Sequence, residues 1–219
     1  MPNLHLTKVP VHELLSQLKT DHNLKTLDLN DPVFRHRAIM GLFGAIDSKK
    51  PREHGGILFR LDQIPGQPPF FLVQSRISPQ TQSYETRELP LPDYKEGDIV
   101  QFTTALNGVR RKTTENSGKR QTKVSPVPLF KPEDTDQFPF DTWVKEKMSS
   151  LFSDTEIVNH RRSVLKSKIH PNLTIQVDDV DGIATICDPE ALRTVMSNGI
   201  GREKSYGCGL VSVRLIKGI

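Results

Sequence analysis

Two Asp-Pro pairs, at 31–32 and 188–189, constrain the fold of this chain more than any other feature of its sequence. Aspartate caps a helix by accepting hydrogen bonds from the first amides, and proline fits the first helical position, where no backbone donor is needed. Each pair therefore predicts a helix start. Apolar residues that follow the first pair at helical spacing predict packing of one helix face on a core. They are Ile39, Leu42, Phe43 and Ile46.

Strand-like runs surround both predicted helices, and their order favours one fold. In the first half, predicted strands at 4–8, 57–61 and 69–74 follow a β-α-β-β order, with further helical turns at 11–18. The second half has the order β-α-β-β-α-β, which is that of the ferredoxin-like fold. Its predicted strands lie at 98–106, 158–169, 173–186 and 209–216, and its predicted helices at 138–152 and 189–198.

The segment 89–97 is rich in proline and charge, which is typical of a linker. We therefore predict an α+β protein of two tandem ferredoxin-like (RRM-like) domains, each an antiparallel sheet with helices on one face. The predicted boundaries are 1–92 for the N-terminal domain and 98–219 for the C-terminal domain. The basic segment that follows residue 106 is expected to be mobile.

Positive charge is concentrated in two segments. The formal net charge is only +4, but 110–123 carries six basic residues against one acid. The segment 160–170 carries four lysines and arginines and no acid. Such clusters indicate a polyanionic partner. The alternative is ordinary solvated loop charge, and clustering on one face of the fold would separate the two interpretations.

Composition excludes several other classes of protein. With 35% hydrophobic and 26% charged residues, the chain has an ordinary soluble composition. The two cysteines, Cys187 and Cys208, lie far apart and lack metal-binding spacing, so neither a zinc site nor a disulfide scaffold is predicted. A cytoplasmic location fits this cysteine usage. No signal peptide and no membrane span are expected.

A glycine-rich loop at 199–209 combines four glycines with two cations, Arg202 and Lys204. Glycines allow close backbone approach, so such a loop is a candidate phosphate cradle. It follows a predicted helix and lacks Gly-Lys-Ser/Thr, which excludes the dinucleotide and Walker signatures. The alternative is a helix C-cap followed by a turn into the last strand. The glycines are Gly199, Gly201, Gly207 and Gly209.

An acidic cluster lies within the predicted strand 173–186, at Asp178, Asp179 and Asp181. A metal site built on it would need further ligands, and no histidine or glutamate stands at metal-ligand spacing from these aspartates. We therefore interpret the cluster as part of a solvated strand or turn. No metal ion or other cofactor is predicted for this chain.

At the glycine-rich loop the sequence resembles a known family. The stretch 199–212 resembles the C-terminal signature of the CasE family, the CRISPR repeat-processing endoribonucleases of type I-E systems. The stretches 98–107 and 181–189 resemble the family's second-domain first strand and the strand before its last helix. Residues 118–120, followed by 126–129, resemble its basic loop. The resemblance covers essentially the whole chain and is strongest at the C-terminus.

The resemblance implies a fold, an activity and partners. Members have two ferredoxin-like domains and cut the repeat RNA, without metal, at the 3′ base of a hairpin. This chain is then expected to cleave by attack of a 2′-hydroxyl, leaving a 2′,3′-cyclic phosphate. It is also expected to stay bound to the guide RNA as a subunit of the Cascade complex. Its expected partners are the CRISPR repeat hairpin and the other Cascade subunits, with no membrane.

The position that matches the family's catalytic histidine is His36, which the resemblance places in the first turn of a helix. There the helix dipole would favour neutral imidazole, a ready base, but a role as acid to the leaving group stays open. Arg37 or Lys204 would stabilise the phosphorane charge. The alternative is that His36 only edges the core. Val33 stands where some relatives carry an assisting tyrosine, which suggests slower cleavage.

RNA contacts are expected from both basic segments and from the glycine-rich loop. Because aromatic residues make up only 6%, we expect recognition of a folded hairpin by shape and charge rather than by base stacking. The segment 158–186 is the predicted main grip. The candidate RNA-binding residues are Arg110, Arg111, Lys119, Arg120, Arg161, Arg162, Lys166, Lys168, Gly199, Gly201, Arg202, Gly207 and Gly209.

Two alternative functions are also consistent with the sequence. The first is a non-catalytic subunit that holds the RNA hairpin with an inert His36, which the valine at position 33 favours. The second is a protein that binds a small phosphorylated ligand at 199–209. Two separate basic segments argue against this second alternative, because a small ligand needs only one cationic site.

Overall fold

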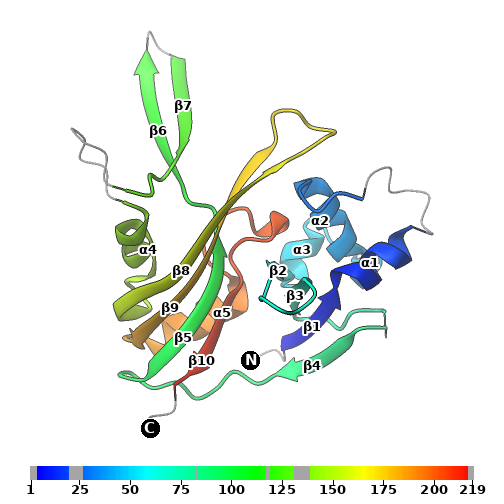
Figure 1. The fold of residues 1–219 in the computed structure, drawn as a ribbon, viewed down its shortest axis with the longest axis horizontal. Helices are drawn as coiled ribbons and strands as arrows, with labels where there is room; N and C mark the ends of the chain where they lie inside the picture. The colour runs from blue at the N-terminus through cyan, green and yellow to red at the C-terminus, as the bar shows by residue number, and fades with distance from the viewer. Residues whose placement is uncertain (1–3, 20–26, 82, 117–118, 131–138, 217–219) are drawn as a thin grey trace.

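The computed structural model describes residues 4–19, 27–81, 83–116, 119–130 and 139–216. Residue 118 of the expected basic loop and the predicted helix start at 138 lie outside the described residues. Within the described part, two four-stranded sheets and one two-stranded hairpin make up the β structure (Figure 1). No described helix is both long and apolar enough to cross a membrane.

The first sheet has the strand order β2-β3-β1-β4, with every neighbouring pair antiparallel, as in a ferredoxin-like domain. Its helices pack on one face, where Phe34 and Ile39 meet Phe59 and Phe71 in one core. The strands are β1 (Leu4–Pro10), β2 (Leu58–Asp62), β3 (Phe70–Ser75) and β4 (Glu85–Leu89). The helices are α1 (Val11–Leu18), α2 (Pro32–Met40), the 3₁₀ turn η1 (Gly41–Phe43) and α3 (Pro51–His54).

Strand β4 was not predicted, because its residues are almost all polar and exposed and show no alternation. It exists through pairing with β1, where the hydroxyls of Thr7 and Thr86 lie 3.0 Å apart. The described residues between β3 and β4 contain no helix, so this half is an incomplete version of the second one. By contrast, the predicted Asp31 cap is confirmed, since its carboxylate accepts from the Val33 amide at 2.8 Å.

The second sheet repeats the same order as β10-β5-β9-β8, again antiparallel throughout. Asp188 caps its last helix, as predicted, by accepting from the amides of Glu190 and Ala191. The predicted fold of two ferredoxin-like units is thereby confirmed. The strands are β5 (Ile99–Leu106), β8 (Phe152–Lys166), β9 (Thr174–Ile186) and β10 (Val211–Leu215), and the helices α4 (Phe140–Met148) and α5 (Pro189–Asn198) share one core with the sheet.

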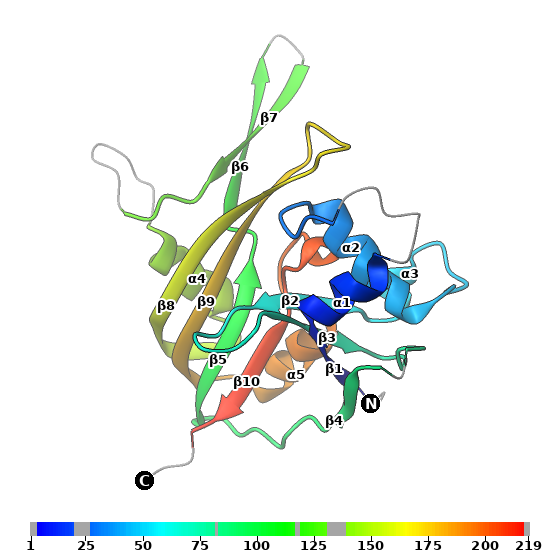
Figure 2. The same cartoon turned by 45° about the vertical axis from the view of Figure 1, so that its right-hand side comes forward.

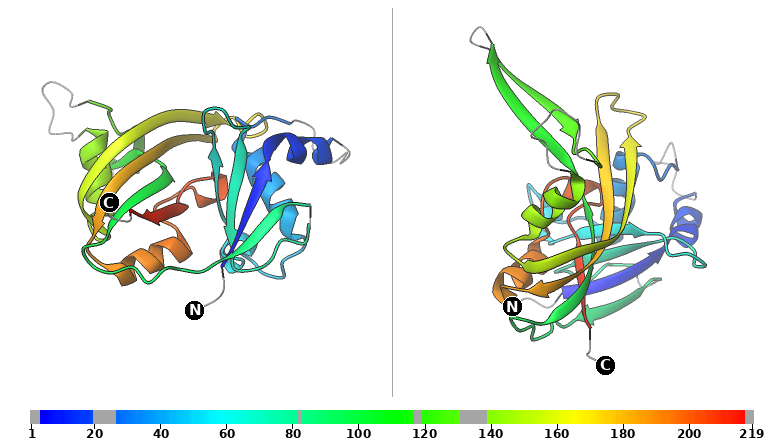
Figure 3. Two further views of the ribbon diagram at one scale, coloured as in Figure 1. Left: turned by 60° about the horizontal axis from the view of Figure 1, so that its bottom comes forward. Right: turned by 60° about the vertical axis from the view of Figure 1, so that its left-hand side comes forward.

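No strand was predicted directly after residue 106, but the structure has two there. Strands β6 (Val109–Asn116) and β7 (Lys119–Pro126) form a hairpin that pairs only with itself and stands out from the body (Figure 3). Apart from Val109, Val124 and Pro126, the residues of its strands are polar, so no alternating apolar pattern marks it in the sequence. The hairpin is held by its ladder and by cross-strand contacts such as that between the hydroxyls of Thr113 and Thr122.

The β8–β9 hairpin reaches the first sheet's helices. Its tip lies beside the start of α2 (Figure 2). There the Lys166 amide donates to the Asn30 carbonyl at 3.0 Å, and the Lys168 amide donates to Asp31 at 3.1 Å. The Lys168 ammonium pairs with Asp28 at 2.9 Å. These contacts fix α2 relative to the second sheet.

A buried arginine also joins the two sheets. Arg60, on β2, pairs with Asp62 at 2.5 Å and donates through Nη1 to the Thr103 carbonyl on β5 at 2.9 Å. It also reaches Ser212, on β10, at 3.3 Å. The chain crosses from β4 to β5 through the segment predicted as a linker. The division at 1–92 and 98–219 stays our proposal for the domain boundaries.

Candidate active site

His36 lies where the two sheets' loops meet. It is the fifth residue of α2, and its Nδ1 lies 3.1 Å from the carbonyl oxygen of Ser205, which comes from the 3₁₀ turn η2 (Lys204–Tyr206). A carbonyl can only accept, so Nδ1 carries the proton and Nε2 of a neutral ring keeps its lone pair. No described residue forms a hydrogen bond with Nε2.

Burial lowers the pKa of His36 and is the largest influence on it. The Ser205 hydrogen bond opposes this effect, whereas the charges of Arg52 and Arg37 add to it. The expected direction therefore agrees with the structure, but the expected cause does not. His36 lies beyond the first helical turn, where the influence of the helix dipole has faded. The half-buried position, not the helix end, favours the neutral imidazole.

A surface cavity of about 330 Å³ opens at His36. Lys50, Arg52 and Glu53 line it together with the Ser205 backbone turn. On the other side, the ring of Tyr206 meets the imidazole edge to face, with centroids 6.2 Å apart. An anion in this cavity would therefore meet a neutral base and two cations, one of which, Lys50, is also paired with Glu53 at 3.1 Å.

The two cations predicted beside His36 occupy different places. Arg37 is exposed on α2 and does not line the His36 cavity, although its charge lowers the His36 pKa. Lys204 donates through Nζ to the carbonyls of Asn198 and Gly199 at 2.8 and 2.9 Å, which caps the end of α5. Burial, followed by the charge of Arg52, lowers the Lys204 pKa.

Sequence reasoning missed Arg52. It lies on α3, donates through Nη1 to the Ile57 carbonyl at 3.0 Å, and lines both the His36 cavity and the one beside it. Burial lowers its pKa. The run Lys49-Lys50-Pro51-Arg52 is a third basic segment that could have drawn attention to it. Tyr206, inside the glycine-rich loop, was also overlooked.

Three of the loop glycines serve close packing against the first sheet and within the loop. A Cβ on Gly199 would lie 2.8 Å from Leu58, and one on Gly207 would lie 3.1 Å from Phe59. A Cβ on Gly209 would lie 2.5 Å from the Ile200 carbonyl oxygen. Gly201 and Arg202, by contrast, are exposed. The close packing at these glycines positions the loop so that Ser205 lies beside His36. Gly201 and Arg202 are accessible to a ligand.

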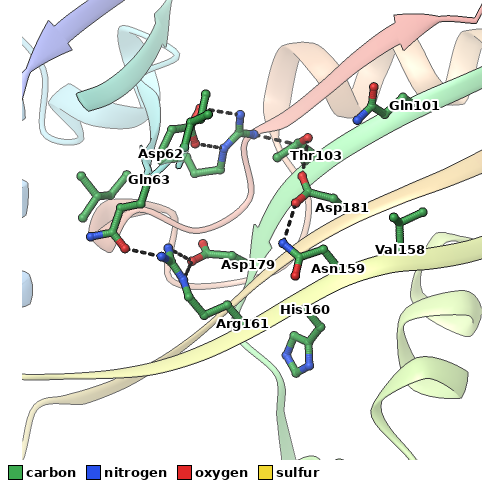
Figure 4. A pocket seen from close by; sticks show the side chains of 13 residues that line it. Asp62, Gln63, Gln101, Thr103, Val158, Asn159, His160, Arg161, Asp179 and Asp181 are labelled. Carbon is green, nitrogen blue, oxygen red and sulfur yellow. Dashed lines mark hydrogen bonds and ion pairs between the residues drawn. The ribbon is translucent and has the colours of Figure 1, made fainter. Parts of the chain in front are cut away.

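Two of the predicted RNA-binding residues on β8 form ion pairs with aspartates of β9. Arg161 bonds Asp179 at 2.6 Å and also donates to Gln63, as Figure 4 shows. Arg162 bonds Asp178 at 2.6 Å. Lys166 and Lys168 are exposed near the hairpin tip. Arg161 and Arg162 therefore already have anionic partners within the fold, and so does Lys168, which pairs with Asp28.

The interpretation of the acidic cluster as solvated was wrong for Asp178, which is fully buried. Besides Arg162, it accepts from His160 Nε2 at 2.8 Å, from the Gly108 amide at 3.2 Å and from Gln176 at 2.8 Å. The His160 ring stacks on Phe140 with centroids 4.1 Å apart. This network ties β8 and β9 to the base of the β6–β7 hairpin, where Gly108 lies.

The β6–β7 hairpin carries the other predicted RNA contacts. Arg111 and Arg120 are exposed, and Arg110 is half-buried. Lys119 begins β7, and its backbone pairs with Asn116. Lys112 and Lys123, both exposed, stand directly opposite each other across the ladder. Like charges in this position repel, so the hairpin is suited to a polyanionic partner.

A larger cavity of about 650 Å³ lies between β2 and the second sheet (Figure 4). Asp181 faces it and accepts from Thr103 at 2.7 Å and from Asn159 at 3.1 Å. None of the three predicted catalytic residues lines this cavity. Its polar groups, including His160, which is bonded to Asp178, are largely bonded within the protein, so the His36 cavity is the better candidate for chemistry.

The protein thus consists of two tandem ferredoxin-like units, with a histidine and several cations where they meet. This arrangement is typical of a protein that binds a polyanion. A family model described as "CRISPR associated protein" matches residues 5–214, and the chain belongs to this family. This match agrees with the resemblance seen in the sequence. No curated protein matches the chain.

Solved structures share the fold. Cse3 of Thermus thermophilus, bound to an RNA representing a pre-cleavage complex, superposes with a TM-score of 0.65 at 21% identity, over 97% of this chain and 99% of that one. Cas6e of Escherichia coli superposes with a TM-score of 0.63 at 21% identity, over 95% and 98%. A chain of a CRISPR RNA-guided surveillance complex gives 0.62 at 22%, over 97% and 100%.

Proposed function

We propose that this chain is a metal-independent endoribonuclease that cleaves the CRISPR repeat hairpin in precursor RNA and then stays bound to the guide RNA as a Cascade subunit. The observation that carries the proposal is the hydrogen bond from His36 to the Ser205 carbonyl, which leaves Nε2 free to accept a proton beside a cationic cavity. The fold shared with RNA-bound Cse3 supports it. The proposal implies a cytoplasmic protein.

In the proposed reaction, Nε2 of His36 takes the proton of a 2′-hydroxyl, and the 2′-oxygen attacks the adjacent phosphorus. The bond from phosphorus to the 5′-oxygen breaks, which leaves a 2′,3′-cyclic phosphate on one strand. The departing 5′-oxygen takes a proton from water in the open cavity. Lys50 and Arg52 offset the charge that builds up on the phosphate oxygens. Arg37 and Lys204 add positive charge from further away.

The second candidate is a non-catalytic subunit that holds the RNA hairpin. Val33, at the position of the tyrosine found in some relatives, favours it, since valine neither donates a hydrogen bond nor transfers a proton. In this chain Val33 is the second residue of α2, and its amide is bonded to Asp31. Tyr206 is a tyrosine beside His36 that comes from the second sheet's side instead.

Cleavage of a labelled repeat hairpin in excess chelator separates the candidates. We expect the wild-type protein to cut once at the base of the stem and to leave a 2′,3′-cyclic phosphate. We expect His36→Ala to bind the RNA but to lose cleavage by about 100-fold or more, as for removal of a general base. His12→Ala is the matched control, because His12 is exposed on α1.

If wild type and His36→Ala bind equally and neither cuts, the protein is a hairpin-holding subunit. If both cut equally, His36 is not the base. If RNA binding is weak and unaffected by salt, the RNA proposal fails as a whole, because phosphate contacts make binding strongly salt-dependent.

A further inference from the structure

A second cavity of about 280 Å³ lies next to the one that contains His36. Three cations from three separate elements line it: Arg52 on α3, Arg76 directly after β3, and Lys204 in η2. The end of α5 closes it through Ser197 and Asn198. Residues from both sheets' sides thus converge here, as they do at His36. Arg52 and Glu53 line both cavities, so the two cavities are adjacent.

Each of the three cations is held in place by neutral oxygens. The Arg76 guanidinium donates to the Asn198 side chain at 2.5 Å, and Arg52 donates to the Ile57 carbonyl at 3.0 Å. Lys204 uses two of its three donors on the carbonyls that end α5. A guanidinium has five N–H groups, so all three side chains keep donors for a further acceptor. The cavity is therefore preorganised for an anion.

Charge in this cavity is only partly offset. Glu53 is the acidic residue in its lining, and it forms an exposed pair with Lys50 at 3.1 Å. Burial lowers the pKa of Lys204 most, and the nearby positive charge of Arg52 lowers it further, as expected for two cations that repel each other. An anion between them would relieve this repulsion.

The backbone at Gly56 makes room for Arg76. Gly56 has a φ of +59°, and a Cβ there would lie 2.7 Å from Arg76 Cγ. Glycine thus supplies both the left-handed backbone and the space in which the arginine stem lies. The Arg76 amide also donates to the Gly55 carbonyl at 2.8 Å, which fixes the start of the side chain.

From this geometry we infer that the cavity of Arg52, Arg76 and Lys204 binds a phosphate of the RNA strand adjacent to the phosphate cut at His36. The inference rests on the proposed function and extends it to a second phosphate subsite. One continuous strand can occupy both cavities, because they share a wall. Gripping the neighbouring phosphate would set which bond of the strand lies against His36.

A scan with single methylphosphonates tests this subsite. Each RNA carries one uncharged linkage, at successive positions on both sides of the cut. With wild-type protein, we expect one position next to the scissile phosphate to lose about three- to tenfold in affinity, as for one charge-assisted contact. With Arg76→Ala, which leaves the His36 cavity lining intact, the same methylphosphonate should cause a clearly smaller loss, because two of the three cations, Arg52 and Lys204, remain. Arg87→Ala is the control, because Arg87 is exposed on β4.

Arg76→Lys keeps the charge and should retain most of the sensitivity at that position, and thermal unfolding checks that each variant is folded. The inference is overturned if the methylphosphonate effect persists unchanged in Arg76→Ala, or if no position beside the cut is sensitive. It is also overturned if millimolar inorganic phosphate abolishes the Arg76 effect without displacing RNA, which would indicate a small-ligand site. If the wild type neither binds nor cuts the repeat, the proposed function itself fails.

Discussion

The hydrogen bond between His36 and Ser205 decides which imidazole nitrogen can do chemistry. It joins residues 169 positions apart in the chain, through a backbone carbonyl rather than a side chain. No sequence motif records such a partner, because any residue at position 205 has a carbonyl. The same contact leaves the side chain of Ser205 without a required role in orienting the base.

The lowered pKa of His36 predicts a particular pH dependence. Its ordinary value is 6.5, and burial moves it downward, so the neutral base should persist to a pH below that value. We expect kcat/KM for RNA cleavage to fall as the pH drops through this lowered pKa and to be nearly flat from pH 7 to 8. Single-turnover cleavage between pH 5 and 8, with RNA binding measured in parallel, checks this.

Arg37→Gln is the informative companion variant for the pH profile. Arg37 is exposed, and its positive charge contributes to the lowering. Its removal should shift the acidic limb slightly toward higher pH while leaving the plateau rate within about threefold. A limb that moves the other way, or one above pH 7 in the wild type, would contradict His36 as the base.

In the β6–β7 hairpin, Lys112 and Lys123 stand opposite each other, and their repulsion does not stabilise the isolated protein. We expect Lys112→Ala combined with Lys123→Ala to weaken binding of the repeat hairpin and to flatten its salt dependence, because phosphate contacts are lost. Each lost contact should reduce the slope of log K against log salt by about 0.7–0.9. Thermal stability should stay the same or rise, since cross-strand repulsion is removed.

Kd measured over a series of KCl concentrations checks this expectation. Thr114→Ala, a change at an exposed polar position of the same hairpin, is the control and should leave the slope unchanged. An unaltered slope in the double variant would remove this hairpin from the RNA path. Substitution of Arg161 or Arg162 is a less clean test, because each has a carboxylate partner whose loss affects folding.

Close approach between the two halves of the molecule depends on Gly199. Its φ is +72°, and a Cβ would lie 2.8 Å from Leu58 and 2.9 Å from the Gly209 carbonyl oxygen. We expect Gly199→Ala to destabilise the protein by about 2–4 kcal/mol through backbone strain and overpacking. Cleavage should also fall, because the loop that brings Ser205 to His36 would be displaced.

Gly66→Ala separates the two effects. Gly66 has a similar φ of +78° but open space around it, so alanine there should cost only about 1 kcal/mol and leave cleavage unchanged. Thermal unfolding and single-turnover cleavage of both variants provide the measurement. Equal behaviour of the two would show that backbone strain alone matters and that the packing of the loop on β2 does not position His36.

Local sequence determined the parts of this protein that depend on nearby residues. The capping aspartates determined where α2 and α5 begin. The spacing of apolar residues indicated which face of α2 packs on the core and where most of the strands lie. Helix caps act within a few residues, so their signal is readable along the chain. The order of these elements was sufficient to predict two ferredoxin-like units, and the resemblance at the glycine-rich loop pointed to His36.

Tertiary structure alone decided what depends on distant partners. Strand β4 forms by hydrogen bonding to the edge of β1. The β6–β7 hairpin forms although its sequence has no alternating apolar pattern. Arg162 was expected to contact RNA, yet it pairs with Asp178, which the sequence showed only as part of an acidic cluster interpreted as solvated. Arg52 joins the site through α3, which lies far from the glycine-rich loop along the chain but lines the same cavity as Lys204 of that loop. Burial and charge pairing arise from long-range packing, and that packing has no local signature.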